Sequence, residues 1–285
     1  MRKIYKWYSK LTKRVKDSII ITMSSIGVIS TFLSVLGLSL ADIETLTIWL
    51  RIVISVFAFI VLYIIIYMLI GRIFRESVST TIHQTSVTVV CGDIFEVPEF
   101  RVIGCDTNFR TEVDDVIISK KSLHGQLILN HGVLDEINAV IEKEAKRLGL
   151  HKNDEGLYDF PLGTIIRYDS SVDNHTYLML AMTELNSNYE SHTNMSEFEY
   201  MLMRMWKEIN RVYAGNDIAL PLLGSGISRF DDGPKEYGAL LRCMLCTLNG
   251  SGVTFNSNIK ILIYGNINDI PLYEYKDIFN IVQRR

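Results

Sequence analysis

The sequence predicts two parts of different construction: a pair of membrane-spanning helices, and then an α/β domain of three layers in which helices cover both faces of a mixed, largely parallel sheet. Two uncharged apolar stretches near the start of the chain predict the helix pair. Beyond them, short apolar runs bounded by Gly, Pro, Asp or Asn alternate with helical patterns, which predicts the α/β domain. We therefore expect a basic N-terminus and a helical hairpin in residues 1–75, a linker in residues 76–85 and the α/β domain in residues 86–285.

Length and composition restrict the possible classes of function. At about 150 residues per domain, 285 residues allow two units at most, and 48% hydrophobic residues exclude a disordered or fibrous chain. The first 75 residues carry 10 Lys and Arg against 3 Asp and Glu, whereas the other 210 carry 19 against 29. A large part with this acidic excess is not expected to bind nucleic acid, which needs a basic face. The four cysteines are too few and too scattered for a disulfide framework, so they suit a reducing compartment.

Two stretches are long enough to cross a bilayer. The 22 uncharged residues Ile19–Leu40 would rise about 33 Å as a helix, which matches a hydrocarbon core of roughly 30 Å. The 19 uncharged residues Ile52–Ile70 form the second stretch, with Trp49 and Tyr67 near its ends, where amphipathic rings favour the interface. Because only the short segment Ala41–Thr47 separates them, the two stretches predict a helical hairpin.

The positions of the cations orient this hairpin. Arg72 and Arg75 follow the second stretch, and the short connection carries Asp42 and Glu44 but no cation. Seven cations precede the first stretch, namely Arg2, Lys3, Lys6, Lys10, Lys13, Arg14 and Lys16. By the positive-inside rule, both termini and the α/β domain are expected on the cytoplasmic side. A secretory signal peptide cut near Ala41 is the competing interpretation, but its apolar region has only about 7 to 15 residues and it leaves the second stretch unexplained.

Small and hydroxylated residues in the first stretch favour close contact between helices, and hence assembly within the membrane. They are Ser18, Thr22, Ser24, Ser25, Ser30, Thr31 and Ser34, together with Gly27 and Gly37. A passive membrane anchor is the alternative interpretation of the hairpin.

The expected elements of the α/β domain follow from hydrophobic periodicity. Strands are expected at Val87–Val90, Val102–Ile103, Gln126–Leu129, Thr164–Tyr168, Tyr177–Met182, Ile218–Leu222 and Ile259–Tyr264. Helical patterns lie at Leu134–Leu148 and Glu197–Tyr213, and the second is expected to begin with a capping box of Ser196 and Glu199. A third helix is expected to start with Pro234 at its first position and to stop near residue 250.

The segment from Ile218 to Phe230 is the first candidate binding element. An apolar strand ends there in Pro221-Leu222-Leu223-Gly224-Ser225-Gly226-Ile227-Ser228-Arg229-Phe230. Small residues let main-chain amides approach a ligand, and successive amides in such a loop form an anion-binding concavity into which a diphosphate would fit. No Gly-Lys-Ser/Thr follows, so this is not a Walker loop, and Arg229 stands where a dinucleotide fingerprint has its third Gly. An ordinary strand-to-helix turn is the alternative.

A second candidate element lies at the end of the first strand of the domain, in Val89-Val90-Cys91-Gly92-Asp93-Ile94. A carboxylate just past a strand end, at the edge of an α/β sheet, can accept a hydrogen bond from the exocyclic amine of adenine. Ile94 offers an apolar surface beside it. The alternative is an aspartate that only shapes a turn.

Taken in order, these motifs are similar to those of macro domains, the modules that bind ADP-ribose. Strand-Gly-Asp-Ile near the domain start precedes Leu-Pro-Leu-Leu-Gly-Ser-Gly-Ile after a later strand, and Ser122-Leu123-His124-Gly125 lies between them. With the preceding hairpin, nearly the whole chain resembles the membrane-anchored macro-domain effectors of Thoeris anti-phage defence.

The resemblance implies a role for each candidate site residue. Asp93 would contact adenine, with Ile94 beside the base, and Tyr264 would pack on the adenine ring unless it is a half-buried strand tyrosine. Asn108 would contact a ribose, while His124 and Phe230 would meet the distal part of the ligand unless they are structural. The diphosphate would be wrapped by Gly224, Ser225, Gly226, Ile227 and Ser228, with Arg229 as a further contact.

The sequence departs from catalytic macro domains in the loop after the second strand. Where those domains have an Asn-rich loop, this chain reads Ile103-Gly104-Cys105-Asp106-Thr107-Asn108-Phe109, and the glycine-rich stretch beyond it is replaced by Thr111-Glu112-Val113-Asp114-Asp115. We therefore expect binding without turnover and no catalytic residues, with a membrane-tethered ADP-ribosyl hydrolase as the alternative. No metal and no cofactor are expected, since Cys243 and Cys246 lie in a predicted helix without a second pair of ligands.

The resemblance also supplies the expected biology. The signal would be an ADP-ribose derivative that a partner TIR-domain enzyme makes from NAD, and its capture would lead to abortive infection. The protein would be a multi-pass protein of the bacterial inner membrane. Because a two-helix hairpin is too small to enclose a pore, we expect a homo-oligomer that disrupts the lipid bilayer.

Overall fold

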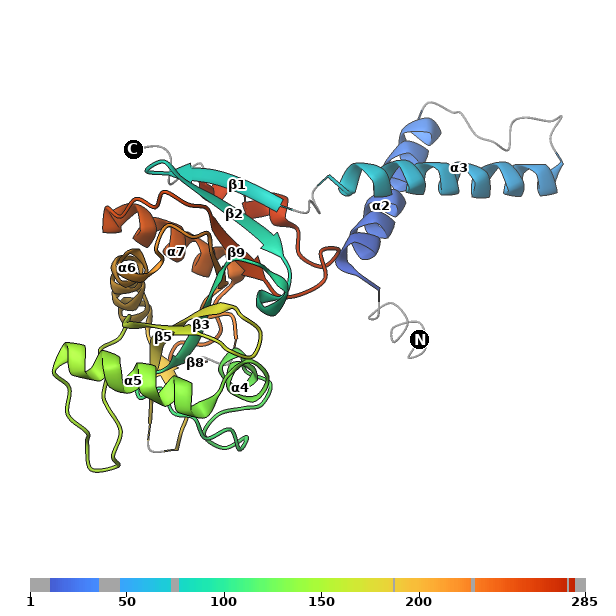
Figure 1. The fold of residues 1–285 in the computed structure, drawn as a ribbon. Helices are drawn as coiled ribbons and strands as arrows, with labels where there is room; N and C mark the ends of the chain where they lie inside the picture. Colours follow the sequence, from blue (N-terminus) through green and yellow to red (C-terminus); the bar gives the residue numbers. More distant parts are fainter. Residues whose placement is uncertain are drawn as a thin grey trace. The chain divides into compact units, whose positions relative to one another are not determined.

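The structure, a computed structural model, describes residues 11–35, 47–72, 77–186, 188–226, 229–275 and 277–279 (Figure 1). These residues divide into two compact units. The first contains the two N-terminal helices together with residues 265–274, and the second contains residues 77–264 and the described residues from 275 onward. The predicted hairpin and the predicted α/β domain thus fall into different units. Residues 265–274, which were expected in the α/β domain, belong to the unit of the two helices.

The first unit contains two long apolar helices, α2 (Lys13–Val35) and α3 (Ile48–Ile70). Each has 23 residues, which corresponds to about 35 Å. Both are long and apolar enough to cross a membrane, and large apolar side chains such as Phe57 (67% exposed) lie on their surfaces. α2 begins at Lys13 instead of Ile19, and the connection at residues 36–46 lies outside the described part of the chain.

α2 and α3 contact each other, and hydroxyl residues are buried on α2. Ser18 and Thr22 are fully buried on α2, and Ile66 and Ile70 are buried on α3. The Thr22 hydroxyl donates to the Ser18 carbonyl oxygen at 2.7 Å, which satisfies it within its own helix. Two of the small polar residues expected at a helix contact are thus buried, whereas Ser24 is exposed.

The second unit is a three-layer α/β/α domain built on a mixed sheet (Figure 1), which confirms the predicted fold class. The strand order is β1-β2-β9-β7-β3-β5-β6-β8, and β4 pairs with β5. From β2 to β5 along this order, neighbouring strands run parallel. The strands are β1 (Ser77–Ile82), β2 (Thr85–Cys91), β3 (Phe100–Asp106), β4 (Ile165–Asp169), β5 (Thr176–Leu185), β6 (Ser191–Thr193), β7 (Ile218–Pro221), β8 (Arg229–Phe230) and β9 (Ile259–Ile263).

The strand expected at residues 126–129 is wrong, because this segment is helical. α4 (Leu123–Gln126) continues into the π-helical turn η3 (Leu127–His131). The Ser122 hydroxyl accepts from the Gly125 N–H at 2.9 Å and so caps the start of α4. Three apolar residues in a row, Leu127–Leu129, do not distinguish a strand from a helix by their period, so the cap just before them is the stronger signal.

The expected linker contains an ordered edge strand. Residues 77–82 form β1, which pairs antiparallel with β2. His83 and Gln84 connect the two strands with φ angles of 46° and 71°, the left-handed pair that a two-residue hairpin turn requires. β1 reads as polar because only Thr80 and Ile82 are buried, while its serines face outward.

Helices cover both faces of the sheet (Figure 1). They are α5 (Leu134–Leu148), which lies on the same side as α4, and α6 (Met195–Val212) and α7 (Tyr237–Ser251) on the other side. The Trp206 indole N–H donates to the Thr247 hydroxyl at 3.1 Å, a buried bond that joins α6 to α7. α5 has the expected bounds, whereas α7 begins at Tyr237, three positions after Pro234.

The N-terminal cap of α6 differs from the expected capping box of Ser196 and Glu199. Asn194 occupies the cap position, and its side-chain oxygen accepts from the Glu197 N–H at 3.0 Å. Asn is among the best cap residues because its short amide reaches this N–H group while its own backbone stays extended. The helix therefore starts before Ser196.

Asn194→Ala should lower the free energy of unfolding by about 1 kcal/mol, because it leaves an N–H group of the first turn without its acceptor. Ser196→Ala should change it much less. Urea unfolding of the two variants beside the wild type measures both values. A larger loss for Ser196→Ala would restore the capping box and contradict the assignment of Asn194.

Candidate functional site

Four parallel strands end at one edge of the sheet. Cys91 of β2 pairs with Ile263 of β9, and Pro221 of β7 pairs with Leu262 of β9, while β3 runs parallel to β7. Ligands of open α/β sheets bind beyond the carboxyl ends of the strands. The segments that leave these ends, in order across the sheet, are residues 92–94, Tyr264, residues 222–226 and residues 107–108.

Asp93 and Ile94 follow the end of β2. The Gly92 N–H donates to the Ile263 carbonyl oxygen at 3.2 Å, which ties this turn to the end of β9. Asp93 Oδ1 accepts from the Phe95 N–H at 2.9 Å and starts the 3-10 turn η2 (Ile94–Glu96), as the turn-aspartate alternative requires. Its Oδ2 accepts no hydrogen bond from the described residues, so the carboxylate can also serve a ligand. Ile94 is only 3% exposed and belongs to the core, which leaves it little surface for a base.

A buried arginine fixes the far end of the segment that carries Asp93. Arg101 is 2% exposed, and its Nε and Nη2 donate to the Val97 carbonyl oxygen at 3.0 and 2.8 Å. Its Nη1 donates to the Tyr177 hydroxyl at 2.9 Å and lies 3.6 Å from the Asp173 carboxylate. A buried charge is stable only when it is paired and hydrogen-bonded, and Arg101 meets both conditions.

Tyr264 directly follows β9 and is 79% exposed. The alternative of a half-buried strand tyrosine is therefore wrong. Because β2 and β9 are paired up to Cys91 and Ile263, the residues that follow them, Asp93 and Tyr264, emerge from adjacent strands. An exposed aromatic face next to a strand that presents a carboxylate suits a planar, amine-bearing ring.

The loop after β7 is shaped by one left-handed glycine. Gly224 has a φ of +80°, and a Cβ there would lie 3.1 Å from Leu240 and 3.2 Å from Phe230. Ser225 closes the turn through its N–H and hydroxyl, which both donate to the Leu222 carbonyl oxygen. The N–H groups of Gly224 and Gly226 donate to no acceptor in the described part of the chain, so they can bind an anion. Ile227 and Ser228, predicted to complete this loop, lie outside the described residues.

Phe230 packs below this loop. Its ring is 5% exposed and meets Phe198 of α6 edge to face, with the ring centres 5.5 Å apart. The packing alternative thus accounts for Phe230, and little of its ring is left for a ribose. Arg229 lies beside it in β8, whose backbone pairs with His192 of β6.

β3 ends at Asp106, a residue that the sequence analysis quoted without giving it a role. Asp106 is 5% exposed, and its carboxylate accepts from the N–H groups of Asn108 at 2.9 Å and of Arg110 at 3.2 Å. The Asn108 side-chain amide donates to Asp159 Oδ1 at 2.7 Å and to the Tyr158 carbonyl oxygen at 3.1 Å. The Asn108 side chain therefore joins the loop after β3 to residues 158–159. An acid at the end of an apolar run, the pattern that marked Asp93, could have marked Asp106 as well.

His124 lies on α4 beneath the same loop. It is 7% exposed, and its Nδ1 is 3.8 Å from the Asp106 carboxylate. Burial lowers the pKa of its imidazole, although the nearby Asp106 acts in the opposite direction. This environment favours a neutral imidazole and a structural role.

Comparison with known proteins identifies the family. The family described as "Thoeris protein ThsA, Macro domain" matches residues 87–264. The curated "Thoeris protein ThsA" of Bacillus amyloliquefaciens (strain Y2) is 31% identical over 278 residues, which cover 94% of this chain and 90% of that protein. This chain belongs to the Thoeris ThsA family. Among solved structures, a mutant of the Oceanobacillus iheyensis macrodomain has a TM-score of 0.50 at 13% identity, over 73% of this chain and 98% of that one, and it shares the fold.

The range matched by the ThsA macro-domain family begins in β2 and ends at Tyr264. It therefore contains all four segments that leave the row of strand ends. The two apolar helices precede it, and the relative from Bacillus amyloliquefaciens aligns over almost the whole chain.

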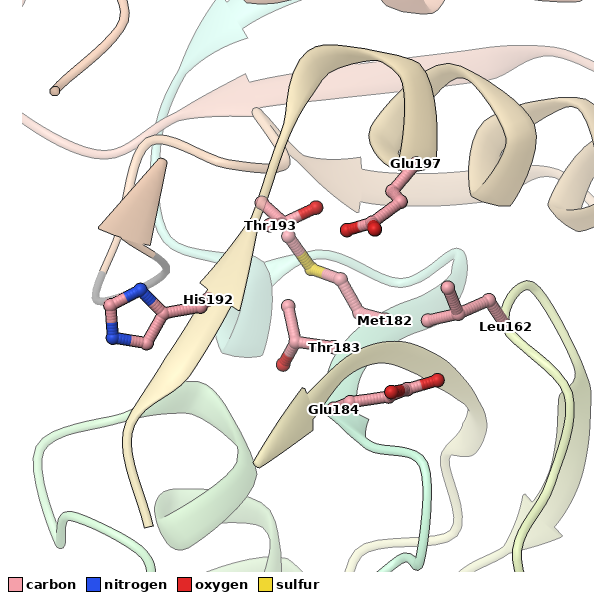
Figure 2. A pocket seen from close by; sticks show the side chains of 7 residues that line it. All are labelled: Leu162, Met182, Thr183, Glu184, His192, Thr193 and Glu197. Carbon is pink, nitrogen blue, oxygen red and sulfur yellow. The ribbon is translucent and has the colours of Figure 1, made fainter. Parts of the chain in front are cut away.

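A small cavity of this ThsA-family protein adjoins two of the predicted segments (Figure 2): the carbonyl oxygen of its lining residue Thr183 accepts from the Thr107 N–H at 3.0 Å, and His192 pairs with Arg229. It has a volume of about 90 Å³ and lies at the ends of β5 and β6 beside the start of α6. Its lining residues are Leu162, Met182, Thr183, Glu184, His192, Thr193 and Glu197, and none of the predicted site residues is among them. Ligand pockets usually have about 300–1,000 Å³, so this cavity is too small to hold a nucleotide.

The two cysteines of the Cys-x-x-Cys pair in α7 lie in different environments. Cys243 is buried, and burial raises the pKa of its thiol to about 12, whereas Cys246 is exposed. A thiol with a pKa this high gives little of the thiolate that binds metals. Within the described ranges, no group of three or more His, Cys, Asp or Glu residues is placed to hold a metal ion.

The burial of His124 predicts a pH dependence of stability. Its folded-state pKa lies below the ordinary value of about 6.5, so the unfolded chain binds the proton more readily. The resulting stability is present above about pH 6.5 and is lost as the pH falls below that value. We expect the wild type to lose more thermal stability than His124→Gln between about pH 7.5 and about pH 5.5. Exposed His151→Gln is the control and should follow the wild type; equal losses in all three proteins would contradict the prediction.

Proposed function

We propose that this protein is a membrane receptor that binds an ADP-ribose-derived nucleotide at the row of strand ends and responds through its two apolar helices. The observation that carries the proposal is the order of the segments across the sheet. A carboxylate and an exposed aromatic ring leave β2 and β9, a glycine loop with free N–H groups follows β7, and a braced polar loop follows β3. A base, a diphosphate and a ribose need these groups in this order.

The adenine would bind at the end formed by Asp93 and Tyr264. Asp93 Oδ2 would accept from the exocyclic amine while Oδ1 keeps its bond to the Phe95 N–H. The ring of Tyr264, which is 79% exposed, would stack on the base. Ile94 contributes mainly through the backbone turn that it shares with Asp93, since its side chain is buried.

The diphosphate would bind at the glycine loop. The N–H groups of Gly224 and Gly226 donate to no acceptor among the residues that the structure describes, and the left-handed φ of Gly224 forms the turn that carries them. The domain carries an excess of acidic residues, so an anion must be held by these local dipoles instead of a broad positive field. Ser225, Ile227, Ser228 and Arg229 complete the proposed set of contacts.

The loop after β3 favours binding over hydrolysis. The Asn108 amide already donates to Tyr158 and Asp159. The Asp106 carboxylate and His124 are both more than nine-tenths buried. None of these groups is presented to an attacking water next to the distal ribose. A hydrolase needs a positioned base within reach of that water.

The helices α2 and α3 would form the membrane part. Their large apolar side chains are exposed, which favours a lipid environment, and the basic N-terminal residues would remain in the cytoplasm with the macro domain. We propose that several copies assemble in the bacterial inner membrane and disrupt it after a TIR-domain enzyme has made the signal from NAD. The result would be abortive infection.

ADP-ribose should bind the full-length protein at a stoichiometry of one per chain in calorimetry. Tyr264→Ala should weaken binding about tenfold, because stacking of a base on an aromatic ring is worth about 1–3 kcal/mol, while Tyr264→Phe should retain it. Asp93→Asn keeps an oxygen for the Phe95 N–H but loses the charged acceptor, and should weaken binding about tenfold. Asp135→Asn, on the exposed start of α5, is the matched control. Equal affinities in all these proteins would remove the proposed site.

Lipid vesicles that contain the reconstituted protein should release an encapsulated dye when the nucleotide product of a TIR-domain enzyme is added. Tyr264→Ala vesicles should retain the dye at the same concentration, because the ring that holds the base is missing. Vesicles with wild-type protein that stay intact would refute the membrane response. Multiple turnovers of an ADP-ribosylated protein substrate would instead favour the hydrolase.

A further inference from the structure

Residues 265–274 belong to the same unit as the apolar helices, although the chain on both sides of them belongs to the macro domain. We call residues 265–274 the strap. Ile270 and Leu272 are buried, and the strap runs into the 3-10 turn η4 (Leu272–Tyr275). The strap is therefore a packed segment with its own buried side chains.

The strap caps the start of α2. The Lys13 N–H donates to Asp269 Oδ1 at 2.8 Å, and the Arg14 N–H donates to the Asn268 carbonyl oxygen at 3.0 Å. These are two of the N–H groups that the first turn of a helix leaves without an internal acceptor. A carboxylate at this position is also favoured by the helix dipole.

Arg14 joins the strap to both helices. Its Nη1 lies 3.4 Å from Asn268 Oδ1, its Nη2 donates to the Tyr67 carbonyl oxygen at 3.1 Å, and its guanidinium carbon lies 4.0 Å from the centre of the Tyr67 ring. Tyr67 is in the last turn of α3, where the helix dipole favours a cation. The fit is close, since a Cβ at Gly71 would lie 2.3 Å from Arg14 Nη2.

The strap begins at the proposed adenine site. Tyr264 immediately precedes it, and the bond from the Gly92 N–H to the Ile263 carbonyl oxygen ties that point to the turn that holds Asp93. Gly265 has a φ of +146°, and a Cβ there would lie 3.0 Å from Ile270 of the strap. The exposed tyrosine is therefore bonded directly to Gly265, the first residue of the strap.

We infer that the strap couples the nucleotide site to the membrane helices: its contacts with Arg14 stabilise the pairing of α2 and α3 described above, and nucleotide binding at Tyr264 loosens them. This inference rests on the proposed function. A ligand shifts the helices only by its different affinity for two arrangements, and the coupling is reciprocal. Contacts that nucleotide binding must loosen reduce its apparent affinity, so their removal should tighten binding.

A mutant cycle tests this coupling in the full-length protein in lipid nanodiscs, with ADP-ribose as the probe. Arg14→Ala and Asn268→Ala should each bind ADP-ribose about fivefold more tightly than the wild type. The double variant should gain no more than Arg14→Ala alone, because Arg14→Ala already removes the contact with Asn268. Asn138→Ala, an exposed position on α5, is the matched control and should keep the wild-type affinity.

The outcomes separate the strap from the proposed function. Unchanged or weaker ADP-ribose binding by Arg14→Ala and Asn268→Ala would overturn the coupling and leave the proposed function intact. Absence of ADP-ribose binding by the wild type would overturn the proposed function, and the coupling with it. Should Arg14→Ala fail to give folded protein, Asn268→Ala decides alone, because it changes the strap without removing the cation from the helix contact.

Discussion

The parallel pairing of β2, β9, β7 and β3 is the constraint on which the rest of this structure depends. Ile261 and Leu262 are successive residues of β9 that point to opposite faces, and both are buried, so the centre of the sheet is covered on both faces and its strands cannot slip without exposing apolar side chains. This register brings together segments that start near residues 92, 107, 222 and 264. The sheet thus fixes where each loop begins. The bond from the Phe95 N–H to Asp93 and the left-handed φ of Gly224 then determine the local shape of two of these loops.

Much of this frame could be predicted because buried parallel strands and amphipathic helices leave strong local patterns. The expected bounds of α5 agree with the structure, and its apolar residues recur at helical spacing on one face. Prediction failed where the local pattern was weak or polar. The apolar run at residues 127–129 is too short to have a period, and β1 shows mostly serine and threonine because one of its faces meets solvent.

The site could be predicted only where a local motif follows a strand. Asp93, Tyr264 and the loop at residues 222–226 fit that description, and the structure places all of them at one edge of the sheet. Such motifs do not predict how deeply a side chain is buried. Ile94 and Phe230 were therefore expected to meet the ligand, although both lie in the core. The bonds from Arg101 to Tyr177 and from Arg14 to Asn268 were also missed, because side-chain pairs that lie 76 and 254 residues apart in the sequence leave no periodic signal.

The exposed ring of Tyr264 has a thermodynamic consequence for any planar ligand that covers it. Four-fifths of this residue's surface is in water (79%), and the hydration of its apolar face contributes to the heat capacity of the free protein. When a ligand covers the face, that water is released and the heat capacity falls. The enthalpy of association must then become more favourable on warming, so the same ligand would bind at a higher temperature with a different balance of enthalpy and entropy.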